Sequence, residues 1–185
     1  ITWKKWLKGF RPSVSKPIKT IYLFADELLN YNEAEIGITT VQLLDKLGYE
    51  VKYVDHAESG RSHISKGLLK EAKKFCQRNI AVFKDIITAE TPLIGVEPSA
   101  ILTFRDEYPD LVRGDEKEAA KKIAANTWMI EEFLAAEMEA GHIKPDQFEQ
   151  AEGLIKFHGH CHQKALSSLV PTKKILSKLT GKEVQ

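Results

Sequence analysis

The sequence predicts an α/β fold, a three-layer sandwich in which helices flank a mostly parallel sheet of about four strands. Short runs of β-branched and aromatic residues alternate along the chain with longer segments of helical periodicity. The helical connections are a dozen residues or more, as right-handed crossovers between parallel strands require. With 185 residues, 43% hydrophobic and 29% charged, the chain can also bury a substantial core.

The first half of this pattern begins with a strand at residues 20–24, whose aromatic and β-branched side chains favour extended backbone. Asn32 can cap the helix that follows, in which apolar residues share one stripe as far as Leu47. Gly48 fits the end of that helix. The second strand is expected at residues 51–54.

The middle of the chain continues the alternation. A polar loop over residues 55–63 leads into a helical segment, residues 64–83, with apolar side chains at steps of three to five. Cys76 lies on that apolar stripe, so we expect a buried structural thiol. The third strand is expected at residues 92–96, and a helix at residues 99–108.

The last part of the pattern contains a long helix and one more strand. Residues 115–140 are rich in Ala, Glu and Lys, with apolar residues available for burial, which predicts one helix. Residues 153–157 are expected to form the fourth strand. One or two helices should follow around Pro171, within residues 161–178.

Residues 1–17 are expected to precede an α/β domain that covers residues 18–185. In residues 1–12, Trp3 and Trp6 belong to an apolar stripe opposite several lysines, which predicts a short basic amphipathic helix. Such a helix can lie on a membrane surface, but packing on its own domain is the commoner arrangement. We therefore expect membrane contact to be peripheral at most. The prolines and serines that follow indicate a linker.

Charge and cysteine content narrow the function classes. The chain has 27 Lys and Arg against 26 Asp and Glu, a net charge of +1, so we expect no nucleic-acid partner. Two cysteines cannot form a disulfide framework and no signal peptide precedes the domain, which favours a cytoplasmic protein. The chain starts at Ile1 without a methionine, and we expect it to be a piece of a longer chain.

A functional site is expected at one edge of the sheet. In open parallel sheets the ligand crevice lies beyond the carboxyl ends of the strands. Polar loops follow all four expected strands, and five of the six histidines lie in them, with His142 the exception. We therefore expect a polar crevice there. Its candidate residues lie in the loops after the second and third strands and in the helices that follow those loops. They are Glu58, Arg61, Lys66, Glu97, Ser99, Arg105 and Glu107.

For some of these candidates, an ordinary structural role is the alternative to a role in the crevice. Ser99 can cap a helix, and Arg105 can form a solvated ion pair with Asp106 or brace the crevice. The chain contains no GxSxG, GxGxxG or GxxxxGK[ST] motif. A nucleophile-elbow hydrolase and a glycine-rich phosphate loop are therefore disfavoured.

The densest polar cluster is in the last loop, and its members are His158, His160, Cys161 and His162. Imidazole nitrogens and a thiolate suit zinc, iron or copper, and a thiol at a helix N-terminus has more thiolate character. Three consecutive residues cannot all face one ion unless the backbone turns sharply, and no CxxC or HExxH spacing is present. A metal site, including mononuclear zinc, and a hydrogen-bonded polar cluster both remain open.

Four stretches, residues 22–26, 58–67, 96–107 and 157–165, resemble the C-terminal cysteine-rich (CCG) domain of FAD-linked oxidases. The group most resembled comprises the FAD and iron-sulfur D-lactate dehydrogenases and glycolate oxidases, related in this domain to the heterodisulfide reductase B subunit. The resemblance implies a lobe that passes electrons from flavin to a quinone or another acceptor. It implies that FAD lies on a separate domain of the same chain or complex. Oxidation of a 2-hydroxy acid would occur there, so this stretch alone would be inactive.

The sequence departs from that family at its cysteines. Glu58 and Ser59 stand where family members carry Cys-Cys, and Ala100 stands where a cysteine follows Glu-Pro-Ser. Cys161 alone matches a family cysteine, whereas an iron-sulfur cluster needs about four thiolates. The resemblance implies a cluster only in the full-length protein, with Cys161 as one of its ligands. His158 and His160 would then be co-ligands or proton carriers. The alternative is a non-catalytic docking domain whose cluster site has decayed.

Overall fold

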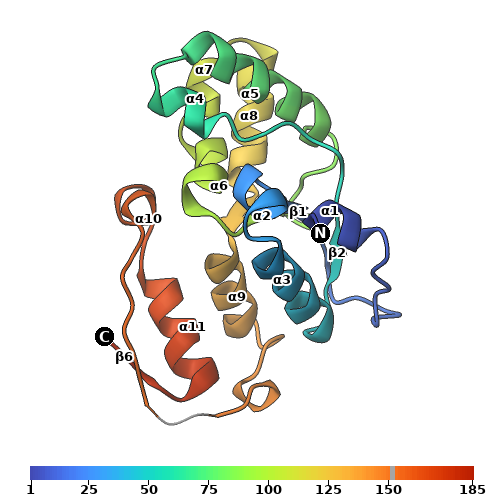
Figure 1. The fold of residues 1–185 in the computed structure, drawn as a ribbon, viewed down its shortest axis with the longest axis vertical. Coiled ribbons are helices and arrows are strands. Elements are labelled where there is room, and N and C mark those ends of the chain that lie inside the picture. The colour runs from blue at the N-terminus through green and yellow to red at the C-terminus, as the bar shows by residue number, and fades with distance from the viewer. Residues whose placement is uncertain (151–152) are drawn as a thin grey trace. The chain divides into compact units, whose positions relative to one another are not determined.

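The computed structural model describes residues 1–150 and 153–185 (Figure 1). It divides into two compact units, Ile1–Trp128 (unit 1) and Met129–Gln185 (unit 2). The predicted α/β class is confirmed, because helices flank a four-stranded parallel sheet of strand order β2-β1-β3-β4.

The elements follow the chain in this order: α1 (Trp3–Leu7), β1 (Thr20–Phe24), α2 (Glu27–Tyr31), α3 (Ala34–Lys46), β2 (Glu50–Lys52), α4 (Arg61–Ser65), α5 (Leu69–Phe83), β3 (Leu93–Gly95), α6 (Pro98–Arg105), α7 (Tyr108–Leu111), α8 (Asp115–Ala125), β4 (Thr127–Met129), α9 (Ile130–Glu139), the 3-10 turn η1 (Pro145–Gln147), β5 (Leu154–Ile155), α10 (Cys161–Leu166), α11 (Val170–Thr180) and β6 (Glu183–Val184).

Strand β1 lies in the interior of the sheet, with the bounds that the sequence predicts. Thr20 pairs with Glu50 of β2, and Tyr22 pairs with Leu93 of β3, both in parallel register. The chain therefore leaves β1 toward one side for β2 and returns to its other side for β3. Such a reversal is a topological switch point, where the loops after the strands diverge and leave a crevice.

Gly95, the last residue of β3, allows α6 to approach the sheet. A Cβ atom at this position would lie 2.4 Å from the Cβ of Ile101, closer than real Cβ contacts. The absence of a side chain at residue 95 thus lets the first turn of α6 pack directly on the strand end, which brings Glu97 to the carboxyl edge of the sheet.

The fourth strand of the sheet differs from the one predicted. It is β4, Thr127–Met129, which interrupts the helix expected over residues 115–140 and separates α8 from α9. Thr127 and Met129 are buried while Trp128 is partly exposed, the alternation typical of a strand. Three residues are too few to show the alternation that would reveal a strand, because the segments on both sides have strongly helical sequences.

The segment expected as the fourth strand, residues 153–157, belongs to a different sheet. Only Leu154 and Ile155 are extended as β5, and they pair in parallel with Glu183 and Val184 of β6 within unit 2. The prediction that four loops share one sheet edge is therefore wrong for the last loop, which contains His158, His160 and His162.

Several helix ends also differ from the prediction. Asn32 is the residue after α2 rather than the cap of α3, which begins after Glu33. The helical backbone begins earlier, at α2, because Oδ1 of Asp26 accepts hydrogen bonds of 2.9 Å from the N–H groups of Leu28 and Leu29.

Two long helical predictions are each divided. The segment over residues 64–83 becomes α4 and α5, which are separated at Gly67, where φ is +72°. The segment over residues 99–108 becomes α6 and α7, and Pro109 lies in the first turn of the second helix.

The N-terminal helix packs on unit 1, as its sequence favours. Trp3 is fully buried against Leu23, Leu29 and Val41, and its ring meets that of Tyr53 edge-on at 5.4 Å. In the described part of the chain no helix is both long enough and apolar enough to cross a membrane.

The thiol of Cys76 is buried on α5, as predicted. Burial raises its pKa to about 12. This thiol is therefore protonated at neutral pH and has the properties of a small apolar side chain.

Unit 2 is organised around the contact of α9 with α11. Gln163 on α10 is buried, and its Nε2 donates hydrogen bonds to Glu131 Oε1 at 3.1 Å and to Thr172 Oγ1 at 2.8 Å. This one amide therefore connects α9, α10 and α11.

Candidate functional site

The loop after β1 places a buried carboxylate at the switch point. Asp26 is 1% exposed, and its Oδ1 caps α2. The pKa of this carboxyl rises from 3.8 to about 6, mainly because of burial. The hydrogen bonds from Leu29 and Leu28 lower it, and the nearby carboxylates of Glu27 and Glu97 make smaller increases. Its Oδ2 is buried and has no hydrogen-bond partner within residues 1–150 and 153–185. Asp26 is thus an acid that titrates near neutral pH.

His56, after β2, connects this loop to the next one. Its Nε2 accepts a hydrogen bond of 3.2 Å from the Ala25 N–H, and its Nδ1 lies 2.7 Å from the Ala57 carbonyl oxygen, to which it donates. The ring stacks on Phe24 at a centroid distance of 4.3 Å. Burial lowers the pKa of His56 to about 4, so the imidazole is neutral and both nitrogens have partners.

Ser59 is the centre of a buried hydrogen-bond network. It is fully buried, and its hydroxyl donates to Glu27 Oε1 at 2.8 Å while its N–H donates to Oε2 at 3.2 Å. The Tyr108 hydroxyl donates to the Ser59 carbonyl at 2.9 Å and accepts from Asn79 Nδ2 at 2.8 Å. This network fixes the loop after β2 against α2, α5 and α7.

Two further pairs of the predicted crevice residues are in contact. Arg61 forms an ion pair with Glu107. Glu97 caps α6, since its Oε2 accepts from the Ala100 N–H at 2.6 Å and its Oε1 accepts from the Ser99 hydroxyl at 2.8 Å. The cap expected of Ser99 is therefore wrong, because the glutamate two residues earlier reaches the first turn of the helix.

The remaining candidates of unit 1 are placed as follows. Lys66 is exposed directly after α4, and Arg105 is half-buried at the last turn of α6. Neither residue lines the cavity described below.

The metal-ligand candidates all lie in unit 2. His158, His160 and Cys161 are exposed, and His162 is half-buried. His160 caps α10 through its Nδ1, which accepts from the His162 N–H at 3.2 Å, and the two rings stack at 5.8 Å. Among the described residues no group of three or more His, Cys, Asp or Glu side chains could hold a metal ion. The mononuclear zinc alternative thus gains no support.

An iron-sulfur cluster does not fit the described residues either. Cys76 is buried and protonated, and Cys161 is exposed. At two positions where the resemblance implies cysteines, the Ser59 hydroxyl is hydrogen-bonded to a carboxylate and Ala100 is buried on α6. A cluster needs about four thiolates, so this part of the chain does not provide one.

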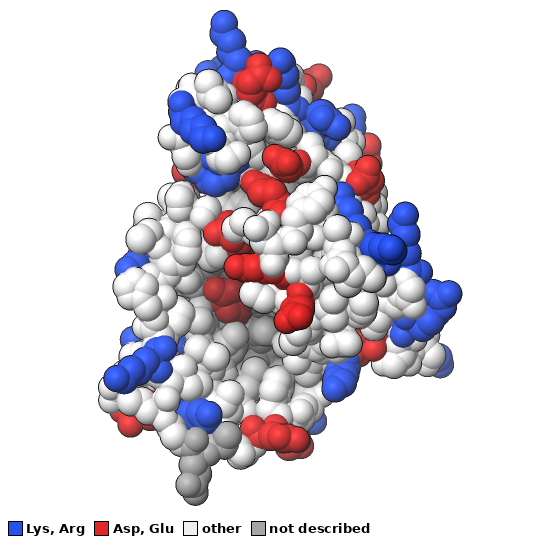
Figure 2. Space-filling view, in the orientation of Figure 1, with Lys and Arg blue, Asp and Glu red and all other residues white. Residues whose placement is uncertain are grey.

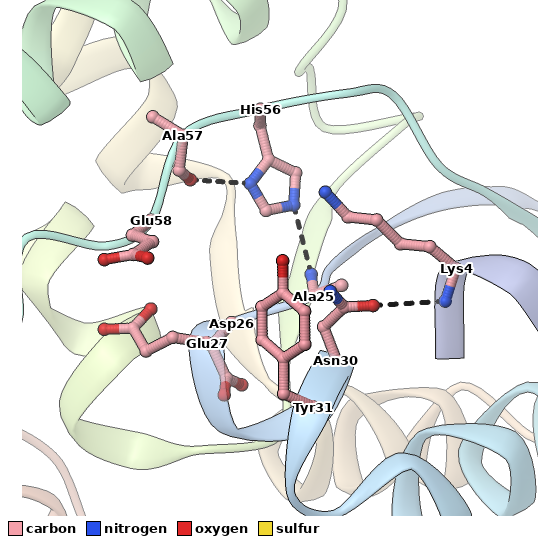
Figure 3. Close-up of a pocket in the computed structure, with 9 residues that line it drawn as sticks. All are labelled: Lys4, Ala25, Asp26, Glu27, Asn30, Tyr31, His56, Ala57 and Glu58. Atoms are coloured by element: carbon pink, nitrogen blue, oxygen red, sulfur yellow. Dashed lines mark hydrogen bonds between the residues drawn. The ribbon is translucent and has the colours of Figure 1, made fainter. Parts of the chain in front are cut away.

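A cavity of about 130 Å³ lies beyond the carboxyl ends of β1 and β2 (Figure 3). We call it the Asp26 pocket. Its polar lining consists of Lys4, Asp26, Glu27, Asn30, Tyr31, His56 and Glu58. In Figure 3 the carboxylates of Glu27 and Glu58 lie on the same side of the pocket. Figure 2, in the orientation of Figure 1, shows several acidic side chains near the middle of the view.

Asp26, Glu27 and His56 were not among the site residues predicted from the sequence. A signal for them was present, since Asp26 and Glu27 directly follow β1 and His56 lies in the loop after β2. The burial that shifts the pKa values of Asp26 and His56 depends on tertiary packing, such as the contacts of the His56 ring with Phe24 and Phe83, which composition does not reveal.

Comparison with curated proteins relates the chain to redox enzymes. It is 27% identical to D-2-hydroxyglutarate dehydrogenase of Escherichia coli K12 over 143 residues. The aligned residues cover 77% of this chain and 13% of that protein. The chain is 26% identical over 168 residues to lactate utilization protein A of Macrococcus caseolyticus, 89% of this chain and 65% of the relative. It is 20% identical over 185 residues to one subunit of the anaerobic glycerol-3-phosphate dehydrogenase of Escherichia coli K12, 99% of this chain and 45% of the relative.

The chain spans less than two thirds of each of these three relatives. No family model matches it, and no solved structure does. The names of the relatives share dehydrogenation or lactate use, which supports an oxidoreductase-associated role for this chain. The narrower assignment to a cysteine-rich CCG domain stays a prediction.

Proposed function

We propose that this chain is a lobe of an FAD-linked oxidoreductase of the D-lactate dehydrogenase and glycolate oxidase type. The observation that carries the proposal is the similarity over 77–99% of the chain to three proteins whose names describe dehydrogenases or lactate utilization. The flavin-bearing part, where a 2-hydroxy acid is oxidised, lies outside these residues.

Within that enzyme, the described residues serve as a docking lobe for the flavin-bearing part. The three positions at which the resemblance implies cysteines before Cys161 support this role, because they hold Glu58, Ser59, which is bonded to Glu27, and the buried Ala100. The hydrogen bonds of Ser59 hold the loop after β2 in place, so the exposed Glu58 beside it offers a fixed position for a neighbouring domain.

Reconstitution with the flavin-bearing part tests docking. The two parts are produced separately and their dissociation constant is measured by calorimetry, for the wild type and for Glu58→Lys. Glu58 is exposed at the polar edge, so the charge reversal should weaken binding at least tenfold. Asp85→Lys, an exposed position on unit 1 after α5, should bind like the wild type. The absence of any complex between the wild-type parts would refute the docking role.

A second candidate function is electron transfer from the flavin to a quinone or another acceptor. Cys161 favours it, because this thiol is exposed at the first residue of α10 and lies between His160 and His162. Residues outside this chain would have to supply the remaining thiolates.

Iron and acid-labile sulfide in the full-length protein distinguish the two functions. Stoichiometric iron and sulfide that are lost in Cys161→Ala but kept in Cys76→Ala would establish the electron-transfer role. An iron-free protein in which 2-hydroxy acid still reduces the flavin would leave docking as the function of the lobe. The Cys76 variant is the matched control because that thiol is buried on α5.

A further inference from the structure

A groove on unit 1 is lined by α1 with the loop that follows it, and by β2 with the residues after it. We call it the α1 groove. Its apolar lining consists of Leu7, Phe10, Pro12, Val51 and Tyr53. Figure 1 shows α1 and this loop beside β2, an outer strand of the sheet. The volume of the groove is about 580 Å³, which is within the range of small-molecule sites.

The wall that α1 and its loop form is anchored at both ends. Trp3 is fully buried, and it lies so close to Gly37 of α3 that a Cβ atom there would be 2.5 Å from its ring. At the other end, the N–H and the hydroxyl of Ser13 donate to the carboxylate oxygens of Asp45, at 2.9 and 2.6 Å. Asp45 is buried on α3. The groove is therefore a pre-formed part of the fold.

The charge of this region specifies the sign of the ligand. Residues 1–25 contain six Lys and Arg, and all 26 Asp and Glu of the chain follow them. Asp55, the one carboxylate in the described lining, accepts from Lys4 Nζ at 3.1 Å and from the Tyr53 hydroxyl at 3.0 Å. Lys8 also lines the groove, is exposed, and forms no ion pair within residues 1–150 and 153–185. An anionic group is the complement of this ammonium.

The shape of the groove favours a soluble ligand over a bilayer. Helices that lie on membranes insert an apolar face into the lipid. Here Leu7, Phe10, Val51 and Tyr53 are each half-buried around a hollow. An apolar part of the ligand must therefore enter the protein, while its charged group stays at the exposed Lys8.

We propose that the α1 groove binds a small amphiphilic anion, with an apolar chain between α1 and β2 and a carboxylate at Lys8 Nζ. Lys4 and Asp55 neutralise each other, so Lys8 is the charge that selects the ligand. The site lies within unit 1, and it does not depend on the proposed oxidoreductase function.

Titration with octanoate, followed by NMR of the backbone amides, tests this proposal. The amides of Phe10, Val51 and Tyr53 should shift saturably. Octylammonium, which has the same chain and the opposite charge, should bind at least about tenfold more weakly. Acetate, which lacks the chain, should produce no saturable shift. Shifts that do not saturate up to about 10 mM octanoate, or equal affinity for octylammonium, would overturn the proposal.

Variants make the test specific to the groove. Lys8→Glu should weaken octanoate binding about five- to tenfold, because it replaces an attraction by a repulsion. Lys5→Glu makes the same charge change at an exposed residue of α1 outside the lining, and it should bind like the wild type. Leu7→Ala removes apolar wall and should weaken binding about fivefold or more. Equal affinity in the wild type, Lys8→Glu and Leu7→Ala would contradict the proposed site.

Anionic phospholipid vesicles distinguish the soluble ligand from a membrane surface. We expect the wild-type chain to stay in solution when vesicles that contain phosphatidylglycerol are sedimented. Sedimentation with the vesicles that excess octanoate does not reduce would assign this basic segment to a membrane, and it would overturn the proposal.

Discussion

The hydroxyl of Ser59 donates a hydrogen bond of 2.8 Å to Oε1 of Glu27. The two residues lie 32 positions apart and connect the loop after β2 to the first residue of α2. At Ser59, where the resemblance to the cysteine-rich domain implies a thiol, this chain has a buried neutral hydroxyl paired with a carboxylate. The position is therefore part of the structural network of unit 1.

Ser59→Ala should destabilise unit 1 by about 1–2 kcal/mol, because it removes a hydrogen bond to a partly buried carboxylate. Chemical denaturation followed by fluorescence measures the change in the free energy of unfolding. Ser62→Ala, an exposed serine in α4, should change it by less than about 0.5 kcal/mol. Equal effects of the two substitutions would show that the Glu27 contact adds no stability.

Tyr108→Phe should cost about 1–3 kcal/mol, since it leaves the Ser59 carbonyl and the Asn79 amide without their shared partner. Tyr31→Phe is the matched control, because Tyr31 is 69% exposed. Thermal unfolding of both variants checks this expectation. An unchanged midpoint in Tyr108→Phe would mean that water replaces the hydroxyl.

Asp26 should make unit 1 less stable as the pH rises from about 4 to 6. Its pKa in the folded chain is about 6 against an ordinary 3.8, so between these values the folded state binds more protons than the unfolded state. The stabilising contribution of Asp26 is complete below pH 4 and is lost as the pH rises through 6. The total loss in the free energy of unfolding is on the order of 3 kcal/mol.

Asp26→Asn should therefore gain stability relative to the wild type as the pH rises from 4 to 8. Urea denaturation at several pH values measures this difference, with Asp85→Asn as the control. A difference that does not vary with pH would show that Asp26 has an ordinary pKa in the folded protein.

His56 should act in the opposite direction. Its pKa in the folded chain is about 4 against an ordinary 6.5, so the unfolded state binds more protons between these values. Its contribution is complete above pH 6.5 and is lost as the pH falls toward 4. NMR titration of the imidazole should show no protonation at pH 5.5.

His56→Phe keeps an aromatic ring beside Phe24 but leaves the Ala25 N–H and the Ala57 carbonyl without their partner. We expect a loss of about 1–3 kcal/mol at pH 7 and a smaller loss at pH 4.5. His158→Gln, a position outside the Asp26 pocket, should leave the pH dependence unchanged. If the stability of His56→Phe fell at acidic pH as steeply as that of the wild type, the lowered pKa of His56 would be contradicted.

The two cysteines should differ sharply in reactivity. Cys161 is exposed, whereas Cys76 is fully buried and its pKa is about 12. A thiol-disulfide reagent at pH 8 should therefore titrate one thiol rapidly in the folded protein and two in denaturant. Cys161→Ser should abolish the rapid phase, and two rapid thiols in the folded wild type would refute the buried position of Cys76.

Local sequence patterns predicted the α/β class, the bounds of β1, the burial of Cys76 and the packing of the N-terminal helix. These features depend on runs of several residues whose side-chain periodicity is set by the helix or strand itself. The prediction of a functional crevice at a sheet edge stays a prediction, although two pairs of its residues are in contact. Ser99 contacts Glu97, and Arg61 pairs with Glu107.

Tertiary structure alone decided which segments pair in the sheet and which polar groups are buried. Three residues, Thr127–Met129, become a strand because β3 offers them backbone partners, whereas Leu154 and Ile155 pair instead with Glu183 and Val184. Strand pairing is a contact between segments distant in sequence, so no local periodicity records it. The same holds for Asp26 and His56, whose pKa values depend on how completely neighbouring helices exclude water.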